Sequence, residues 1–426
     1  MAKSVIKQKI KERNFIAEEA KKELKLTEIL KTETPGYIES EKPTHQISQL
    51  MIKENVNILT AEKAYNLSLE DGPFFCNYTK DGRHILLRNN CGFLSSFDAK
   101  TLDLHFEINI SDKINDALFL HNELFIAVAQ TSSLFIYDKQ GREVHCDRKN
   151  RNVNKMDFLP YHFLLVSLSK EGVLRYQDTS IGKIVSEIIT KEFDENILVQ
   201  NPTNAIMYVG NRKGVVSLWS PNCKEYVSKV LCHKNRINSI CVDRGGNYLI
   251  TSGCDGKIKI WDNRNMFNPV NEICSKFNVV ESCLSQMNML AFGYKNKIKI
   301  LNNIFTKNLE DILYLEHSLS KSSVTSLKFC PYEDILTVGH TNGMTNLVVP
   351  GSGDPVFDSY EDMPFSTKKM RQENEVKRLL EKIPYELISM ESLIGNLKTD
   401  IEKENEGLKE KKYKKKKGAL SRFYDE

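Results

Sequence analysis

The sequence predicts an all-β fold, a seven-bladed β-propeller with helical N- and C-terminal extensions. Three observations lead to this prediction: a strand-like pattern that occurs seven times, an interval of about 40 residues between its copies, and turn residues within each interval. Blades of such rings are four-stranded sheets of this length, and each blade buries both faces only by stacking on its neighbours. We place the propeller over residues 60–350.

The repeated pattern is a small residue, then alternating apolar residues, then an aromatic residue with Asp or a related side chain. Alternation with period two is typical of a half-buried strand, and Asp81-Gly82 and Asp255-Gly256 are turn signals within the repeats. The interval is that of WD-repeat blades. The copies read GFLSSFD (92–98), SSLFIYD (132–138), GVLRYQD (172–178), GVVSLWS (214–220), GKIKIWD (256–262), NKIKILN (296–302) and GMTNLVV (343–349).

One copy carries the full polar set of a WD repeat: His233, Thr251, Asp255 and Trp261. We expect these buried groups to satisfy one another, since an unpaired one costs about 1–3 kcal/mol. Catalytic use of the His, Thr and Asp is the alternative. The position of Asp255 is held in the other copies by Cys91, Thr131, Glu171, Lys213, Lys295 and Asn342. Those six blades are therefore expected to depend on apolar packing.

Residues 1–59 form the predicted N-terminal extension. Residues 1–31 are lysine-rich, and their apolar residues are spaced for an amphipathic helix that docks on a partner; a solvated helix or a disordered arm is the alternative. These apolar residues are Ile6, Ile10, Ala17, Ala20 and Leu24. Residues 32–59 contain Pro35-Gly36 and Pro43, and we expect an extended connector there.

Residues 351–398 follow the propeller. The loop PGSGDP (350–355) resembles a phosphate cradle only superficially, because the chain has no GxxxxGK and no helix is expected directly after Gly353. A helix is predicted over Phe365–Ile383, between Pro364 and Pro384. Its apolar stripe either packs on the propeller or enters a partner's groove. The stripe consists of Val376, Leu379, Leu380 and Ile383.

Residues 399–426 are polar and charged, and we expect them to be disordered when free. The lysines in KEKKYKKKK (409–417) are candidates for contacts with RNA phosphates or for a nuclear or nucleolar address; a solvated tail is the alternative. The RNA-binding candidates are Lys411, Lys412, Lys414, Lys415, Lys416 and Lys417.

Composition excludes several classes of protein. With 40% hydrophobic and 27% charged residues the 426-residue chain is ordinary for a globular protein, and no apolar run approaches the roughly 20 residues of a membrane span. The charged N-terminus argues against a secretory signal. Ten cysteines without CxxC pairs indicate reduced thiols rather than a metal site. Without HExxH or GxSxG, no catalytic residues, cofactor or small-molecule substrate are expected.

Six stretches make the chain similar to a known family. They are NYTKDGRHILL (77–87), LHNELFIAVAQ (120–130), FLPYHFLLVS (158–167), RYQDTSIGKIVSEI (175–188), QNPTNAIMYVGNRKGVVSLWSPN (200–222) and the whole of 330–388. The sequence resembles the family of U3 small-nucleolar-RNA-associated protein seven, known in animals as the BING4-type WD-repeat protein. The last stretch is the most specific, because ordinary WD-repeat proteins have ended before it.

The resemblance implies a nucleolar, non-catalytic scaffold of the small-subunit processome in ribosome biogenesis. Such a protein binds assembly factors, pre-rRNA and U3 snoRNA during pre-rRNA processing. The basic ends of this chain are expected to be shorter than those of family members. An alternative is a substrate receptor of a cullin-type ubiquitin ligase, because WDNR at Trp261–Arg264 matches the WDxR pattern of propellers that dock on such ligases.

Overall fold

The computed structural model describes residues 35–40, 42–191, 197–275, 277–305, 312–320, 322–357, 363 and 366–388, together with 11, 13–15 and 18. The chain divides into two compact units, Met1–Ile388 and Ser389–Glu426. The second unit lies outside the described residues.

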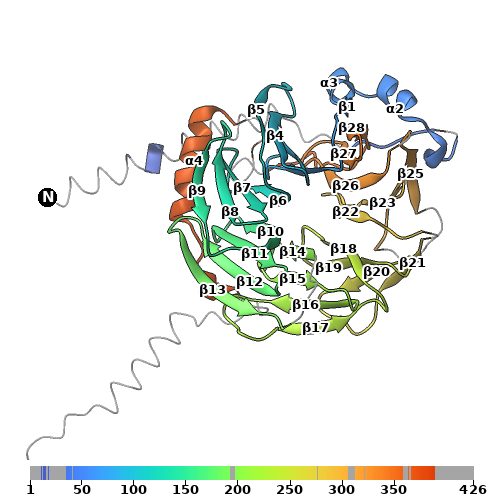
Figure 1. The fold of residues 1–426 in the computed structure, drawn as a ribbon. Helices are drawn as coiled ribbons and strands as arrows, with labels where there is room; N and C mark the ends of the chain where they lie inside the picture. Colours follow the sequence, from blue (N-terminus) through green and yellow to red (C-terminus); the bar gives the residue numbers. More distant parts are fainter. Residues whose placement is uncertain are drawn as a thin grey trace, which may run out of the picture. The chain divides into compact units, whose positions relative to one another are not determined.

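Within the described part of the first unit, the strands form seven four-stranded antiparallel sheets arranged as a ring (Figure 1). The predicted seven-bladed propeller is confirmed. Blade 1 consists of β2 (Phe74–Tyr78), β3 (His84–Asn89), β4 (Phe93–Asp98) and β5 (Leu104–Asn109). Blade 2 consists of β6 (Ile114–Phe119), β7 (Phe125–Gln130), β8 (Leu134–Asp138) and β9 (Glu143–Asp147).

The next three blades repeat this order along the chain. Blade 3 consists of β10 (Val153–Leu159), β11 (Leu164–Ser169), β12 (Val173–Asp178) and β13 (Lys183–Ile189). Blade 4 consists of β14 (Ile197–Gln200), β15 (Met207–Gly210), β16 (Val215–Trp219) and β17 (Ser228–Leu231). Blade 5 consists of β18 (Ile237–Val242), β19 (Tyr248–Gly253), β20 (Lys257–Asp262) and β21 (Asn271–Cys274).

The last two blades complete the ring. Blade 6 consists of β22 (Glu281–Leu284), β23 (Leu290–Tyr294), β24 (Lys297–Leu301) and β25 (Leu313–Ser318). Blade 7 consists of β26 (Val324–Phe329), β27 (Ile335–His340), β28 (Gly343–Val348) and the N-terminal β1 (Asn66–Ser68). β1 pairs with β28 in the register Asn66↔Thr345 to Ser68↔Gly343. Strands from the two ends of the propeller therefore share one sheet and close the ring, with β1 as the outer strand of blade 7 and β28 paired on both sides.

Each copy of the sequence pattern coincides with the third strand of a blade. In blade 5, for example, β20 pairs with β19 in the register Leu249↔Trp261 and Thr251↔Lys259. The apolar residues Ile258 and Ile260 on this strand are fully buried. The period-two alternation thus separates fully buried side chains on one face of the strand from less buried ones on the other.

The N-terminal connector differs from the extended chain that was expected. It contains the 3₁₀ helix η1 (Thr44–Gln46) and the short helices α2 (Gln49–Asn55) and α3 (Ile58–Glu62). The side chain of Gln49 holds α2 on the propeller, because it donates to the carbonyl of Val348 and accepts from its amide, each at 3.0 Å. This tertiary contact, which local sequence does not encode, supports helices too short to be stable alone.

The C-terminal helix is also shorter than expected. It is α4 (Lys368–Leu380), not Phe365–Ile383, and η2 (Tyr385–Leu387) follows it. The hydroxyl of Thr367 accepts from the amide of Met370 and caps the N-terminus. The helix ends early because the amide of Ile383 donates to the carbonyl of Tyr161 on blade 3, at 3.0 Å.

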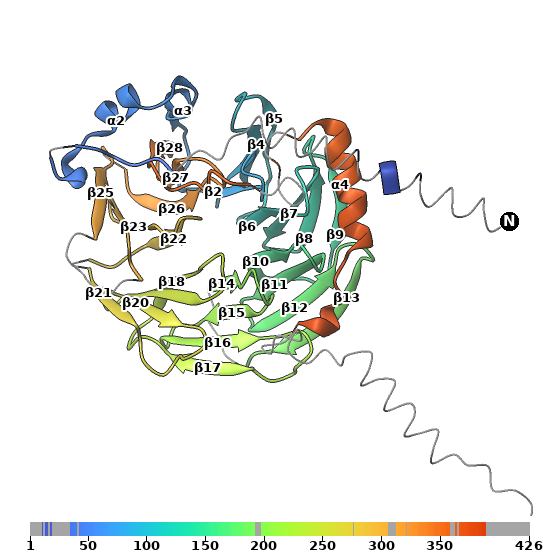
Figure 2. The ribbon, with the colours of Figure 1, turned by 180° about the vertical axis from the view of Figure 1, so that it is seen from behind.

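Because each blade is an antiparallel meander, its turns alternate between the two faces of the ring. The turns between first and second strands, and between third and fourth strands, lie on one face, which we name the strap face. The remaining turns and the connections between blades lie on the other, which we name the open face. Figure 2 shows α4 alongside β9, and the bonds of α4 to His121 and Glu123, in the turn between β6 and β7, place it on the strap face.

Candidate functional site

The strap face is covered by the chain that follows β28. We name the described residues of 350–388 the strap. It begins where the carboxylate of Asp334 accepts a hydrogen bond from the amide of Gly353 (2.9 Å), so the glycine-rich loop cradles a carboxylate of its own chain. Gly351 has a φ of 84°, and a Cβ there would lie 2.4 Å from the carbonyl oxygen of Gly36. Only glycine fits between these segments.

The strap next contacts blades 6 and 5. The side-chain oxygen of Gln286 accepts from the amides of Tyr332 (2.8 Å) and Asp354 (3.2 Å), which joins blades 6 and 7 to the strap. Arg244 of blade 5 forms an ion pair with Asp354 at 3.0 Å. The first part of the strap therefore links three neighbouring blades.

Helix α4 docks on blade 2 through polar side chains. Arg371 forms an ion pair with Glu123, and His121 Nε2 lies 3.0 Å from Glu375 Oε1. Burial would raise the pKa of the Glu123 carboxyl, but a backbone amide and the Arg371 guanidinium hold it below its ordinary value. Since Glu123 is ionised at neutral pH, the attachment of α4 to this turn is electrostatic.

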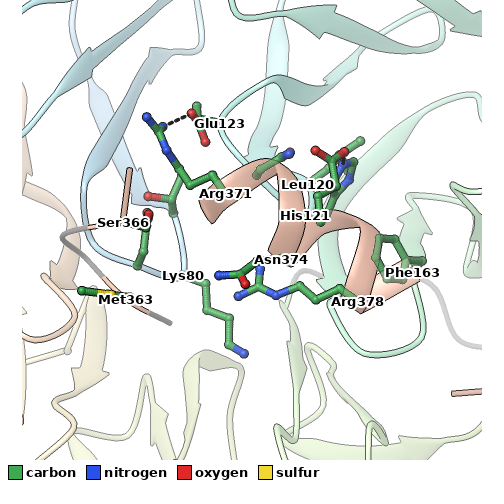
Figure 3. Close-up of a pocket in the computed structure, with 14 residues that line it drawn as sticks. Lys80, Leu120, His121, Glu123, Phe163, Met363, Ser366, Arg371, Asn374 and Arg378 are labelled. Carbon is green, nitrogen blue, oxygen red and sulfur yellow. Dashed lines mark hydrogen bonds and ion pairs between the residues drawn. The ribbon is translucent and has the colours of Figure 1, made fainter. Parts of the chain in front are cut away.

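A cavity of about 70 Å³ lies between α4 and the turns of blades 1–3 (Figure 3). The wall of the cavity includes Thr79, Lys80 and Asp81 of blade 1 and Phe163 of blade 3. Its volume suits a few water molecules and is far below the 300 Å³ or more of a typical small-molecule site.

After α4 the strap is fixed to blade 3 by backbone and side-chain bonds. His162 Nδ1 donates to the carbonyl of Ile383 at 3.0 Å, and burial lowers the pKa of this imidazole. Lys382 forms an ion pair with Asp178, the Asp that ends the repeat pattern of blade 3. Burial opposes ionisation of Asp178, but hydrogen bonds from Lys382 and Ser180 lower its pKa below the ordinary value.

The strap is anchored on blade 4 by Ile388. Its side chain is 2% exposed and belongs to the apolar core of blades 3–5. Its carbonyl accepts from Ser220 Oγ (2.9 Å) and Asn222 Nδ2 (3.0 Å). Together with the cavity wall on blade 1, these bonds bring the described strap into contact with every blade, so the strap acts as a second clasp on the ring.

The side chains of the predicted apolar stripe do not take part in this docking, although the backbone of Ile383, beyond the end of α4, bonds to blade 3. Among the described residues, Val376 is 57% exposed, Leu379 42%, Leu380 81% and Ile383 37%. The helix presents charged residues to the propeller and its apolar stripe to solvent. This arrangement is opposite to that of an ordinary surface helix. The geometry disfavours packing of the stripe on the propeller and leaves it available to a partner.

The structure brings His233, Thr251, Asp255 and Trp261 together in blade 5. His233 Nδ1 lies 3.1 Å from both carboxylate oxygens of Asp255, and Nε2 lies 2.9 Å from Thr251 Oγ1. Trp261 Nε1 donates to the same hydroxyl at 3.0 Å. His233 is 1% exposed and Thr251 is fully buried, so a substrate has no access to them. The geometry is that of a structural staple.

Blade 3 contains a second polar staple that the sequence reasoning missed. Asn150 donates to Asp147 (2.9 Å) and Gln177 (3.2 Å), and Ser167 donates to Asn150 (3.2 Å). The expectation that blade 3 depends on apolar packing alone is therefore wrong. The signal was present as spacing, because Ser167 precedes Gln177 by the ten residues that separate Thr251 from Trp261.

The other sequence-predicted residues are not brought into a common site. The candidate lysines of 411–417 and the apolar residues of the predicted N-terminal helix lie outside the described residues. Arg264 of the WDNR motif is exposed and donates to Asn247 Oδ1 at 3.3 Å. Within the described ranges, no group of three His, Cys, Asp or Glu side chains could hold a metal ion. No described helix has the length and apolarity to cross a membrane.

A second exposed apolar patch, also missed, lies on α2 and α3. Leu50 is 73% exposed, Ile58 75% and Leu59 72%. The signal was the apolar content of a segment that we had assigned to a connector. Like the stripe of α4, these exposed side chains are a candidate contact surface.

Two protein-family models match this chain, one at a propeller repeat and one at the region that contains the strap. A WD domain, G-beta repeat, matches residues 224–262, which contain β17 of blade 4, the first three strands of blade 5 and the staple. A BING4CT (NUC141) domain matches residues 313–391, which contain β25, the strands β26–β28 of blade 7 and the strap. The strap is thus a family feature and not an appendage of this chain.

Curated relatives resemble most of the chain. WD repeat-containing protein 46 of Homo sapiens is 40% identical over 90% of this chain and 64% of its own length. The Caenorhabditis elegans protein of the same name is 40% identical over 88% of this chain and 64% of its own length. U3 small nucleolar RNA-associated protein 7 of Saccharomyces cerevisiae is 37% identical over 86% of this chain and 69% of its own length. The chain spans less than two thirds of the human and worm relatives.

The staple of blade 5, the strap that follows blade 7 and the similarity over nearly the whole chain lead to one family. This chain belongs to the family of BING4-type WD-repeat proteins that includes WD repeat-containing protein 46 and U3 small nucleolar RNA-associated protein 7.

Proposed function

We propose that this chain is a non-catalytic scaffold of the small-subunit processome in ribosome biogenesis, located in the nucleolus. It holds other assembly factors, pre-rRNA and U3 snoRNA while pre-rRNA is processed and the small subunit matures. Its similarity over most of its length to the yeast relative carries the proposal, since that relative's name states an association with U3 small nucleolar RNA.

The form of the molecule supports a scaffold. A ring clasped by β1 and by the strap is rigid, and it carries two exposed apolar surfaces, the stripe of α4 and the patch on α2 and α3. Several weak attachments on one rigid body raise the effective concentration of each partner for the others. The buried staple and the small cavity offer no site for a metabolite.

The alternative of a ubiquitin-ligase receptor has weaker support. It rests on WDNR at Trp261–Arg264, where Trp261 belongs to the staple and Arg264 bonds to Asn247 within the same blade. The comparisons do not favour it.

The test is affinity purification of the tagged chain followed by gradient sedimentation. We expect U3 RNA, pre-rRNA and processome proteins in the large particles with the chain. A variant that lacks residues 399–426 should associate more weakly if Lys411–Lys417 contact RNA phosphates. Recovery of cullin adaptors without U3 RNA would contradict the proposal.

A further inference from the structure

The turns of the open face on blades 4–6 carry an excess of cations. Arg212 and Lys213 lie between β15 and β16, Lys234 and Arg236 before β18, and Lys295 between β23 and β24; all five are exposed. We name these residues the basic arc. In the described turns of these three blades on this face, Asp255 is the one acidic residue, and His233 occupies its carboxylate.

The turns of the arc on blade 4 and before β18 are neighbours in space. The amides of Cys232 and His233 donate to the carbonyl of Gly214, which joins the first two turns, and a Cβ on Gly214 would collide with the carbonyl of His233 at 2.0 Å. The amide of Cys254 donates to the carbonyl of Arg236 at 2.9 Å. The staple of blade 5 therefore fixes the turn that presents Lys234 and Arg236.

Three cations of the arc lack a carboxylate partner among the described residues. Lys213, Lys234 and Arg236 form no ion pair with any residue that the structure describes. On the strap face, by contrast, the cations Arg371, Lys382 and Arg244 each have a carboxylate partner. Unpaired cations in a row attract a polyanion, and the counterions condensed on the polyanion are released when it binds.

An aromatic ring stands at the end of the arc. Phe277 is 46% exposed and stacks on Tyr294, with ring centroids 5.5 Å apart and an interplanar angle of 20°. Lys295 Nζ lies 4.9 Å from the centre of the Phe277 ring. An exposed ring beside cations is the combination with which proteins bind single-stranded nucleic acid, because the base stacks while the cations contact the backbone.

We propose that the open face of blades 4–6 binds single-stranded RNA, with Lys213, Lys234, Arg236 and Lys295 on the phosphates and Phe277 stacked on a base. This inference rests on the proposed function, since it assigns a surface to its RNA partner. A flexible single strand can follow successive blades around a ring, which a stiff duplex cannot do over such a short curve. The arc adds to, and is independent of, the lysines of 411–417.

The test is binding of a fluorescent 20-nucleotide oligo(U) RNA to the full chain, measured by anisotropy across a salt series. The variant combines Lys213→Glu, Lys234→Glu and Arg236→Glu. The matched control combines Arg142→Glu, Lys183→Glu and Lys224→Glu, three exposed residues of the opposite side with the same total change of charge. Thermal melting of both variants checks that each still folds.

We expect the arc variant to bind at least about tenfold more weakly at 0.15 M salt, with a log–log salt slope reduced by about 2, since each lost phosphate contact removes about 0.7. The control should lose less than about threefold. Phe277→Ala should weaken binding about fivefold or more at unchanged slope, because stacking does not depend on counterions.

Equal losses in the arc variant and the control would overturn the inference, as would an arc that binds oligo-glutamate but not RNA. Failure of this inference is separable from failure of the proposed function. An arc variant that binds RNA normally while the chain still sediments with U3 RNA contradicts the inference alone. A chain that never enters the large particles contradicts the proposed function.

Discussion

The two faces of the ring use the same kinds of charged residues in different ways. On the strap face, Arg371 and Lys382 form ion pairs with Glu123 and Asp178, and these pairs hold the strap to the ring. On the open face, Lys234 and Arg236 have no such partner among the described residues. A cation that is paired inside the molecule stabilises its own fold, whereas an unpaired one remains available to a polyanion.

The largest effect is expected when the strap is released from the ring at Ile388. Ile388→Ala should lower the free energy of unfolding by about 2–4 kcal/mol, because it leaves a cavity in the core of blades 3–5. Denaturant titration measures this loss, and limited proteolysis should show faster cleavage within 366–388. Leu387→Ala is the matched control, since Leu387 is 50% exposed and should change stability by less than about 0.5 kcal/mol. Equal effects of both substitutions would contradict the role of Ile388.

On the open face, His233→Ala should lower the free energy of unfolding by about 1–3 kcal/mol, because it leaves Asp255 and Thr251 without their partner. Hydrogen exchange should become faster in 232–236, the turn that presents Lys234 and Arg236. His145→Ala, at an exposed position of β9, is the control. Unchanged exchange in this turn would show that the staple does not fix it.

The ion pairs of the strap face should respond to acid. The folded pKa of Asp178 is lowered, so the pair with Lys382 contributes stability above the ordinary aspartate value of 3.8, and this contribution is lost as the pH falls through the folded pKa. Proteolysis of the strap by an acid-active protease should therefore accelerate in that range. Lys382→Gln should lower the free energy of unfolding by about 1 kcal/mol at neutral pH. It should also reduce the acceleration of strap proteolysis at acid pH. Lys369→Gln, on a residue 86% exposed, should do neither.

The smallest expected effect belongs to the apolar stripe of α4. Leu379→Gln with Leu380→Gln should change the free energy of unfolding by less than about 0.5 kcal/mol, because both side chains are exposed and Gln has a similar helix propensity. Co-purification of processome proteins should nevertheless decline. A loss of 2 kcal/mol or more would show that the stripe packs on the propeller after all.

The sequence was sufficient for the ring because the third strand of each blade repeats one pattern, from Gly92–Asp98 to Gly343–Val349. Blade 5 was predicted in detail because His233 and Trp261 are distinctive residues. Blade 3 was not, since Asn150, Ser167 and Gln177 are ordinary polar residues whose role depends on spacing.

The path of the strap could not be predicted for a different reason. Its contacts, such as Ile383 with Tyr161 and Ile388 with Ser220, join backbone groups to turns more than 160 residues away in sequence. Backbone hydrogen bonds leave no side-chain pattern. The basic arc was hidden likewise, because its cations come from separate turns that only the ring brings together, while the net charge of the whole chain is only +4.

The division of labour between the two faces can be tested most directly by ultraviolet crosslinking of the purified full chain to single-stranded RNA, followed by mass spectrometry of the crosslinked peptides. We predict crosslinks in 211–214, 232–236 and 277–296 on the open face, in addition to any in the lysine-rich tail. Crosslinks confined to strap-face turns, such as 120–124 and 161–163, would contradict the account.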